Sequence, residues 1–113
     1  MPFIDSKITV EVSKEKREVV KAELGKAIAV MGKGESFLML GFEDNYDLYM
    51  GGKKLDKGAF VSVNLLGNAV SSACEAMTEQ ICKIFEKELG IPGSAIYVTY
   101  QGYKDWGWNG KNF

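Results

Sequence analysis

The sequence predicts an α+β fold of two layers, in which two βαβ units form one four-stranded mixed sheet with two helices on a single face. Three observations lead to this prediction. A strand–helix–strand pattern occurs twice along the chain, each helical segment carries one apolar stripe, and a length of 113 residues suits one compact domain. We therefore expect a single domain over residues 1–113.

The first unit begins at residues 3–12, where apolar and polar side chains alternate as in a strand. Ser13 is the expected N-cap of a helix through about Met31, whose apolar residues recur at steps of three and four. Gly32 ends this helix. The run SFLMLGFE is apolar on both faces, which predicts a central strand covered on two sides. A turn-rich stretch follows, with a short strand expected at residues 48–50.

The second unit repeats the plan with a clearer pattern. The run AFVSVNLLG predicts a strand with Ala59, Val61, Val63 and Leu65 on one face. The helix expected at residues 69–89 has a wide apolar stripe, and Gly90 and Pro92 end it. The run SAIYVTY predicts a last strand, and GYKDWGWNGKNF a compact aromatic tail.

Both helices on one face would leave the other face of the sheet uncovered. That face would carry half-apolar, half-polar side chains from two strands: Phe60, Ser62, Asn64, Leu66, Tyr97 and Thr99. An open surface of this kind is more often buried in an oligomer than left to solvent, so the pattern predicts self-association.

Composition excludes several classes of function. With 14 basic and 15 acidic side chains the net charge is -1, which gives no basic field for nucleic acid or an anionic membrane. No apolar run approaches the roughly 18 residues that a membrane span needs. The first residues do not resemble a secretory signal, so we expect a cytoplasmic protein without classical export.

The residue types also argue against metals and cofactors. Without histidine, a zinc site or a Ser/Cys–His nucleophile is not expected. Cys74 and Cys82 are eight residues apart, about 12 Å on a helix, which is too far for a disulfide. The GKG around Lys33 lacks the spacing of a phosphate-binding loop. We expect no metal and no cofactor.

Pro2 offers chemistry that needs no histidine. Initiator methionine is generally removed before a small residue, and the chain would then start with a secondary amine. A terminal amine has an ordinary pKa near 8, and an apolar pocket beside a cation lowers it further. Such an amine is a general base at neutral pH, able to abstract a proton from a carbon next to a carbonyl.

Six short motifs run in order across the whole chain: MPF at the start, MGKG at 31–34, GG at 51–52, SVNLLG at 62–67, IYVTY at 96–100 and the ending GWNGKNF. Together they resemble the macrophage migration inhibitory factor (MIF) family of the tautomerase superfamily. The stretch EDNYDLYMGGKKLDKG departs from vertebrate members and indicates a distant, microbial homologue.

The resemblance implies a homotrimer around an axial channel, with three active sites at subunit interfaces. It implies a cofactor-free tautomerase that interconverts the enol and keto forms of small carbonyl acids of the phenylpyruvate type. Pro2 would be the catalytic base. Lys33 would meet the substrate's negative charge and help keep the Pro2 amine neutral.

The resemblance also implies the substrate-binding residues. The backbone N–H of Leu66 would donate to a substrate oxygen, and Tyr97 would reach across from a neighbouring subunit. Aromatic walls would come from Phe37, Trp106, Trp108 and Phe113. Asn64 and Thr99 stand where many vertebrate members carry histidine and asparagine, which predicts a shifted substrate preference. The CxxC of the animal cytokine is missing, so no redox activity is assigned.

A second reading stays open beside the enzyme. The protein would then be a MIF-like cytokine that binds a host receptor, with the pocket secondary and release from the cell by a non-classical route. A third, an oligomeric scaffold with neither role, would be inert in both kinds of assay.

Overall fold

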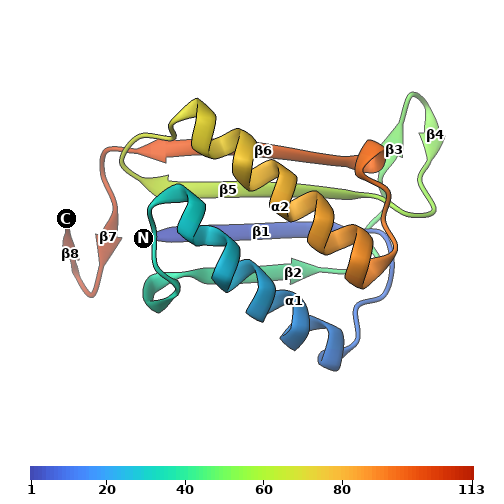
Figure 1. The fold of residues 1–113 in the computed structure, drawn as a ribbon, viewed down its shortest axis with the longest axis horizontal. Coiled ribbons are helices and arrows are strands. Elements are labelled where there is room, and N and C mark those ends of the chain that lie inside the picture. Colours follow the sequence, from blue (N-terminus) through green and yellow to red (C-terminus); the bar gives the residue numbers. More distant parts are fainter.

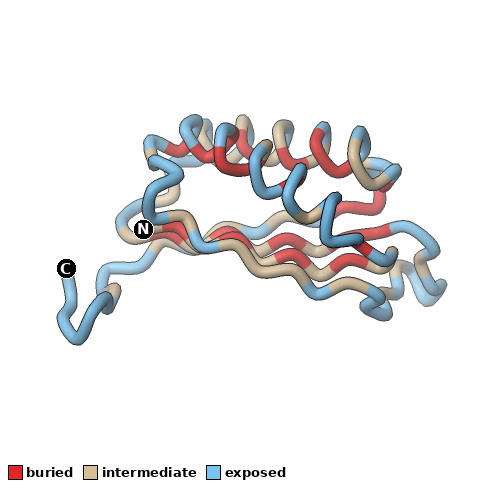
Figure 2. The backbone as a smooth tube through the Cα atoms, turned by 90° about the horizontal axis from the view of Figure 1, so that it is seen from below, coloured by how far each residue is buried: buried red, intermediate tan, exposed pale blue.

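The structure is a computed structural model that describes all 113 residues, Met1–Phe113. A four-stranded sheet forms one layer, and two helices cover one of its faces (Figures 1 and 2). The sheet consists of β1 (Pro2–Ile8), β2 (Met39–Glu43), β5 (Ala59–Leu66) and β6 (Ile96–Tyr103), and the helices are α1 (Lys14–Ala27) and α2 (Ser71–Leu89).

The strand order is β2-β1-β5-β6. β1 runs parallel to β2 and β5 runs parallel to β6, while the two central strands, β1 and β5, are antiparallel. Two βαβ units are therefore joined side by side into one mixed sheet, which confirms the predicted fold class.

The core lies between the sheet and the helices because both layers turn one apolar side inward. On β5, Ala59, Val61, Val63 and Leu65 are buried, as their alternation predicts. β1 buries every second residue from Pro2 to Ile8 in the same way. α2 adds the apolar stripe of Met77, Ile81, Ile84 and Phe85.

Both helices begin and end close to where the sequence places them. Ser13 caps α1, its hydroxyl accepting the backbone N–H of Lys16 at 3.1 Å. The α-helix ends at Ala27, and a 3₁₀ turn, η1 (Ile28–Met31), continues it to Gly32, whose φ of 71° suits glycine. Gly90 ends α2 with a φ of 67°.

One strand prediction is wrong. β2 is an edge strand, not a central strand covered on both sides, and Met39 at its start is 68% exposed. An apolar run shows that a strand is hydrophobic but does not show where the strand lies in the sheet. It therefore cannot distinguish a central strand from an edge strand. β1 is also shorter than expected: it ends at Ile8, whereas the sequence predicts a strand to residue 12.

Three short elements and two hairpins complete the chain. The hairpin of β3 (Tyr49–Met50) and β4 (Lys53–Lys54) lies at one end of the sheet (Figure 1). The hairpin of β7 (Gly107–Trp108) and β8 (Lys111–Asn112) lies at the other end, beside the N-terminus. The short 3₁₀ elements are η1, η2 (Glu35–Phe37) and η3 (Gly93–Ala95). Neither helix combines the length and apolar character that a membrane crossing requires.

Candidate active site

A hollow of about 840 Å³ opens at the end of the sheet where β1 begins. The start of β1 lies against the end of β5, with Pro2 opposite Leu65 and Phe3 opposite Asn64. The segment around η2 and the C-terminal hairpin form further walls. The hollow is lined by Met1, Pro2, Phe3, Ser36, Phe37, Leu38, Met39, Asn64, Tyr103, Asp105, Trp106, Gly107 and Trp108. Five of the predicted site residues therefore meet there: Pro2, Phe37, Asn64, Trp106 and Trp108.

The terminal amine of the chain lies at this hollow, near Lys33. In the structure Met1 carries that amine, and the nitrogen of Pro2 belongs to a peptide bond. Burial lowers the pKa of the amine from its ordinary value of 8.0, and the positive charge of Lys33 lowers this pKa further. An amine with a lowered pKa is neutral over a wider range of pH, which is what a general base requires.

Lys33 is held in place by the turn that follows η1. Its Nζ donates to the carbonyl oxygen of Leu66 at 3.0 Å, so the lysine reaches the strand next to β1. This ammonium is the only cation that contributes to the lowered pKa of the terminal amine. The pairing of Lys33 with the amine stays a prediction, and the direction of this pKa shift agrees with it.

The backbone N–H of Leu66 also lies at the start of β1. It donates to the carbonyl oxygen of Met1 at 3.1 Å. That oxygen takes the hydrogen bond that the resemblance assigns to a substrate oxygen. Met1 thus covers both the Pro2 nitrogen and the Leu66 donor.

Aromatic rings build one side of the hollow. The Phe37 ring meets Trp108 edge-on at 5.6 Å between centroids, and Phe113 stacks on Trp108 at 6.0 Å. The backbone N–H of Phe113 donates to the Trp106 carbonyl oxygen at 3.0 Å, which fastens the end of the chain to the hairpin. Phe113 therefore supports the wall by packing on Trp108 and does not itself line the hollow.

Tyr97 and Thr99 lie away from this hollow. Tyr97 is opposite Phe60, which is opposite Lys7, near the far end of β1 from Pro2. Thr99 is opposite Ser62, halfway along the sheet. Both side chains are exposed on the uncovered face. One chain does not bring them to Pro2, so their predicted role requires a second chain.

Sequence reasoning missed several residues that line the hollow, among them Phe3, Met39, Tyr103 and Asp105. A signal for Tyr103 was present. It continues the alternation of β6 through Tyr97, Thr99 and Gln101, and so belongs to the uncovered face. Met39 could not have been found, because β2 was expected to be covered on both sides.

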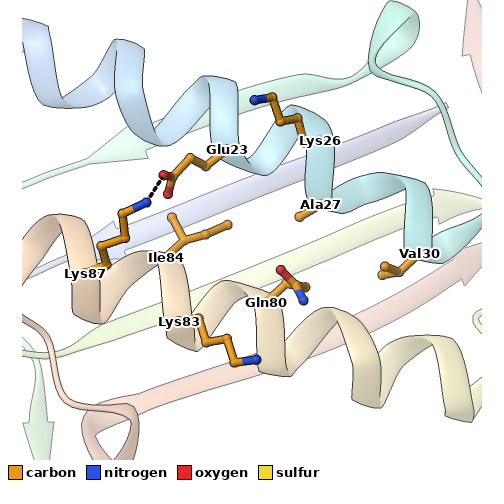
Figure 3. A pocket seen from close by; sticks show the side chains of 8 residues that line it. All are labelled: Glu23, Lys26, Ala27, Val30, Gln80, Lys83, Ile84 and Lys87. Carbon is orange, nitrogen blue, oxygen red and sulfur yellow. Dashed lines mark hydrogen bonds and ion pairs between the residues drawn. The ribbon is translucent and has the colours of Figure 1, made fainter.

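A second hollow, of about 470 Å³, lies on the outside of the molecule between α1 and α2 (Figure 3). It holds none of the predicted site residues. Lys87 reaches across it to Glu23 at 2.7 Å, which ties the two helices together. The shape of this hollow follows from packing two helices side by side.

The chain offers no ready metal site. No cluster of three or more histidine, cysteine, aspartate or glutamate side chains is present. Cys74 and Cys82 both lie on α2 as free thiols, and burial raises the pKa of the Cys82 thiol.

Comparisons with family models and with curated protein sequences give no match. Comparison with solved structures gives many. MIF2 of Leishmania major is 35% identical, with a TM-score of 0.92 over 100% of this chain and 97% of that one. The MIF homologue of Prochlorococcus marinus is 24% identical, with a TM-score of 0.86 over 98% of each chain.

MIF of Toxoplasma gondii is 20% identical, with a TM-score of 0.88 over 98% of this chain and 99% of that one. At these lower identities the likeness to the Prochlorococcus and Toxoplasma proteins shows the fold alone. The Leishmania protein shares more than a third of its residues over nearly its whole length, and on that ground the chain belongs to the macrophage migration inhibitory factor family.

Proposed function

We propose that the protein is a cofactor-free keto–enol tautomerase of small carbonyl acids of the phenylpyruvate type. The amine of Pro2 acts as general acid and base once Met1 has been removed. Membership of the MIF family supports a MIF-like or tautomerase function in general. The proposal of this particular reaction rests on the position of the terminal amine. The amine lies at a hollow with aromatic walls, and burial and Lys33 lower its pKa.

The proposed reaction moves one proton. The neutral nitrogen of Pro2 takes the proton from the enol oxygen, and the carbonyl forms as the electrons of the double bond shift toward carbon. The protonated amine then gives a proton to that carbon. Lys33 faces the negative charge of the acid, and an interaction of this kind is stronger where aromatic walls exclude water.

Removal of Met1 would open the site in two ways. It would free the Pro2 nitrogen from its peptide bond, and it would free the backbone N–H of Leu66 from the Met1 carbonyl oxygen. The freed N–H could then donate to an oxygen of the substrate. An aryl group fits the walls formed by Phe37, Trp106 and Trp108.

The proposal includes a homotrimer. The uncovered face of the sheet is half apolar, and it carries Tyr97 and Thr99 at a distance from the Pro2 hollow of the same chain. In a trimer these side chains would complete the site of a neighbour. The receptor-binding alternative, cytoplasmic location and non-classical release stay predictions, and no contact in the structure favours the receptor over the enzyme.

The test compares three samples in one assay with the enol of phenylpyruvate, after intact mass has established the state of residue 1. Protein without Met1 should turn over the enol. Protein that retains Met1, and the variant Pro2→Gly, should lose at least about 100-fold in kcat/KM, the usual worth of a general base. A folded Pro2→Gly protein with undiminished activity would show the mechanism to be wrong.

A further inference from the structure

Tyr103 and Asn64 form a polar pair in the mostly hydrophobic lining of the hollow. The Tyr103 hydroxyl donates to Oδ1 of Asn64 at 3.1 Å, and both side chains line the hollow that holds Pro2. The two residues are 39 positions apart in the sequence and come from β6 and β5. This hydrogen bond therefore joins the C-terminal end of β6 to β5 at the hollow.

The protein fixes Tyr103 at three points. Its carbonyl oxygen accepts the backbone N–H of Gly67 at 2.8 Å, its ring meets Trp106 edge-on at 5.9 Å, and its hydroxyl is bound to Asn64. Gly102 permits this close approach, because a Cβ there would overlap the carbonyl oxygen of Gly67. The hydrogen bond from Gly67 fixes the backbone of Tyr103, and the phenol is held by its contact with Trp106 and its hydrogen bond to Asn64.

The pair leaves one group free. A carboxamide has one oxygen acceptor and one NH₂ donor. Oδ1 of Asn64 is occupied by Tyr103, while its Nδ2 has no hydrogen-bond partner in the chain. Asn64 lies opposite Phe3 on β1, next to the Pro2–Leu65 pair, so this free donor is close to the proposed base.

Other polar side chains line the hollow and differ from Asn64 in what they offer a ligand. The Tyr103 hydroxyl already donates its hydrogen bond to Asn64. Asp105, when ionised, is a carboxylate that can only accept hydrogen bonds. Ser36, on the η2 segment, and the indole N–H groups of Trp106 and Trp108 are further donors, but none of the three residues lies on the four-stranded sheet. Among side chains from the sheet, the Asn64 amide is the donor that remains for a ligand oxygen.

We propose that Tyr103 is a positioning residue, which orients the Asn64 carboxamide so that Nδ2 donates a hydrogen bond to an oxygen of the bound carbonyl acid. The chemical class of the ligand rests on the proposed function. The hydrogen bond from Tyr103 turns Oδ1 away from the ligand and presents the amide as a donor. Asn64 then adds a neutral contact beside the charge of Lys33 and the backbone N–H of Leu66.

The test is a double-mutant cycle on protein without Met1, with two readouts. Affinity for phenylpyruvate is followed by fluorescence, because the only two tryptophans in the chain both line the hollow. KM and kcat are measured with the enol. The variants are Tyr103→Phe, Asn64→Ala and the double variant, and Tyr46→Phe is the matched control. This control removes the same hydroxyl group at a residue whose backbone is hydrogen-bonded to Ile8, at the far end of β1 from the hollow.

Each single variant should weaken binding by about twofold to tenfold, the usual worth of one hydrogen bond, and should change KM more than kcat. The double variant should bind no more weakly than Asn64→Ala, because Tyr103 acts through Asn64. Asn64→Asp should weaken binding of phenylpyruvate more than Asn64→Ala does, whereas the methyl ester of phenylpyruvate should show a smaller difference. Tyr46→Phe should behave as the parent protein.

The inference is overturned if Tyr103→Phe leaves binding unchanged, if it weakens binding equally in the Asn64→Ala background, or if phenylpyruvate does not bind. Its failure differs from that of the proposed function. If turnover depends on Pro2 but the effects of Tyr103→Phe and Asn64→Ala are independent, only this inference is wrong. If phenylpyruvate binds and the two substitutions are coupled but no turnover occurs, the tautomerase proposal is wrong and the role of the Tyr103–Asn64 pair stands.

Discussion

Lys33 combines two roles in one side chain. Its charge lowers the pKa of the terminal amine, second only to the effect of burial, and its Nζ is held at the Leu66 carbonyl oxygen. The same effects should act on the Pro2 amine after Met1 is removed. A lowered pKa keeps the base neutral near neutral pH, and activity is lost as the pH falls through that pKa, because the amine becomes protonated.

Replacing Lys33 should therefore change the pH profile as well as the rate. Lys33→Gln removes the charge, so the pKa of the amine rises and the acid limb of kcat/KM moves to higher pH. The loss of a charged contact to the substrate should lower kcat/KM by about 10- to 100-fold. Lys26→Gln, in the outer hollow between the helices, is the matched control and should leave the limb in place. An unmoved limb in Lys33→Gln would contradict the electrostatic role.

At the scale of elements, alternation predicts most of the fold. The buried and exposed sides of β5 follow from its pattern of small and branched apolar residues, and the caps of α1 and α2 follow from Ser13 and Gly90. The position of β2 does not follow from its own residues. A strand's place in a sheet depends on its partners, and Met39 is exposed at the edge of the sheet, where it lines the hollow.

The candidate site was predictable only in part for a related reason. Pro2, Lys33 and the aromatic residues of the tail were found through short motifs. The alternation of β6 places Tyr103 on the uncovered face, but its contact with Asn64 depends on how the strands pair, so its role could not be predicted. The sequence places residues on a face of a strand, but the pairing of strands decides which of them meet.

β1 carries one polar side chain on its buried face. Ser6 is fully buried, and its hydroxyl has no hydrogen-bond partner in the protein. Because an unpaired buried hydroxyl costs about 1–3 kcal/mol, Ser6→Ala should raise the free energy of unfolding by about 1 kcal/mol in a urea titration. Ser72→Ala, on the exposed surface of α2, should stay within about 0.5 kcal/mol of the parent. A destabilised Ser6→Ala protein would indicate that the hydroxyl has a partner in solution.

At the scale of the whole molecule, the separation of Tyr97 from Pro2 leads to a prediction about mixed oligomers. Pro2→Gly and Tyr97→Ala chains should each have low activity alone. If one subunit supplies Pro2 and its neighbour supplies Tyr97, then oligomers reassembled from both kinds of chain contain some intact sites and regain activity. Activity is measured before and after unfolding and joint refolding. No gain in a mixture that co-assembles would mean that the site does not span two chains.

The central claim is that the nitrogen of Pro2 is a base with a lowered pKa, and proline labelling tests it directly. The chain has only two prolines, and the nitrogen of Pro92 is always in a peptide bond, so ¹⁵N-proline gives two NMR signals of which one can titrate. In protein without Met1, we predict that the Pro2 signal titrates with a pKa below the ordinary value of about 8 for a terminal amine. In Lys33→Gln that pKa should rise. A Pro2 nitrogen that titrates at or above the ordinary value in the parent protein would contradict the account.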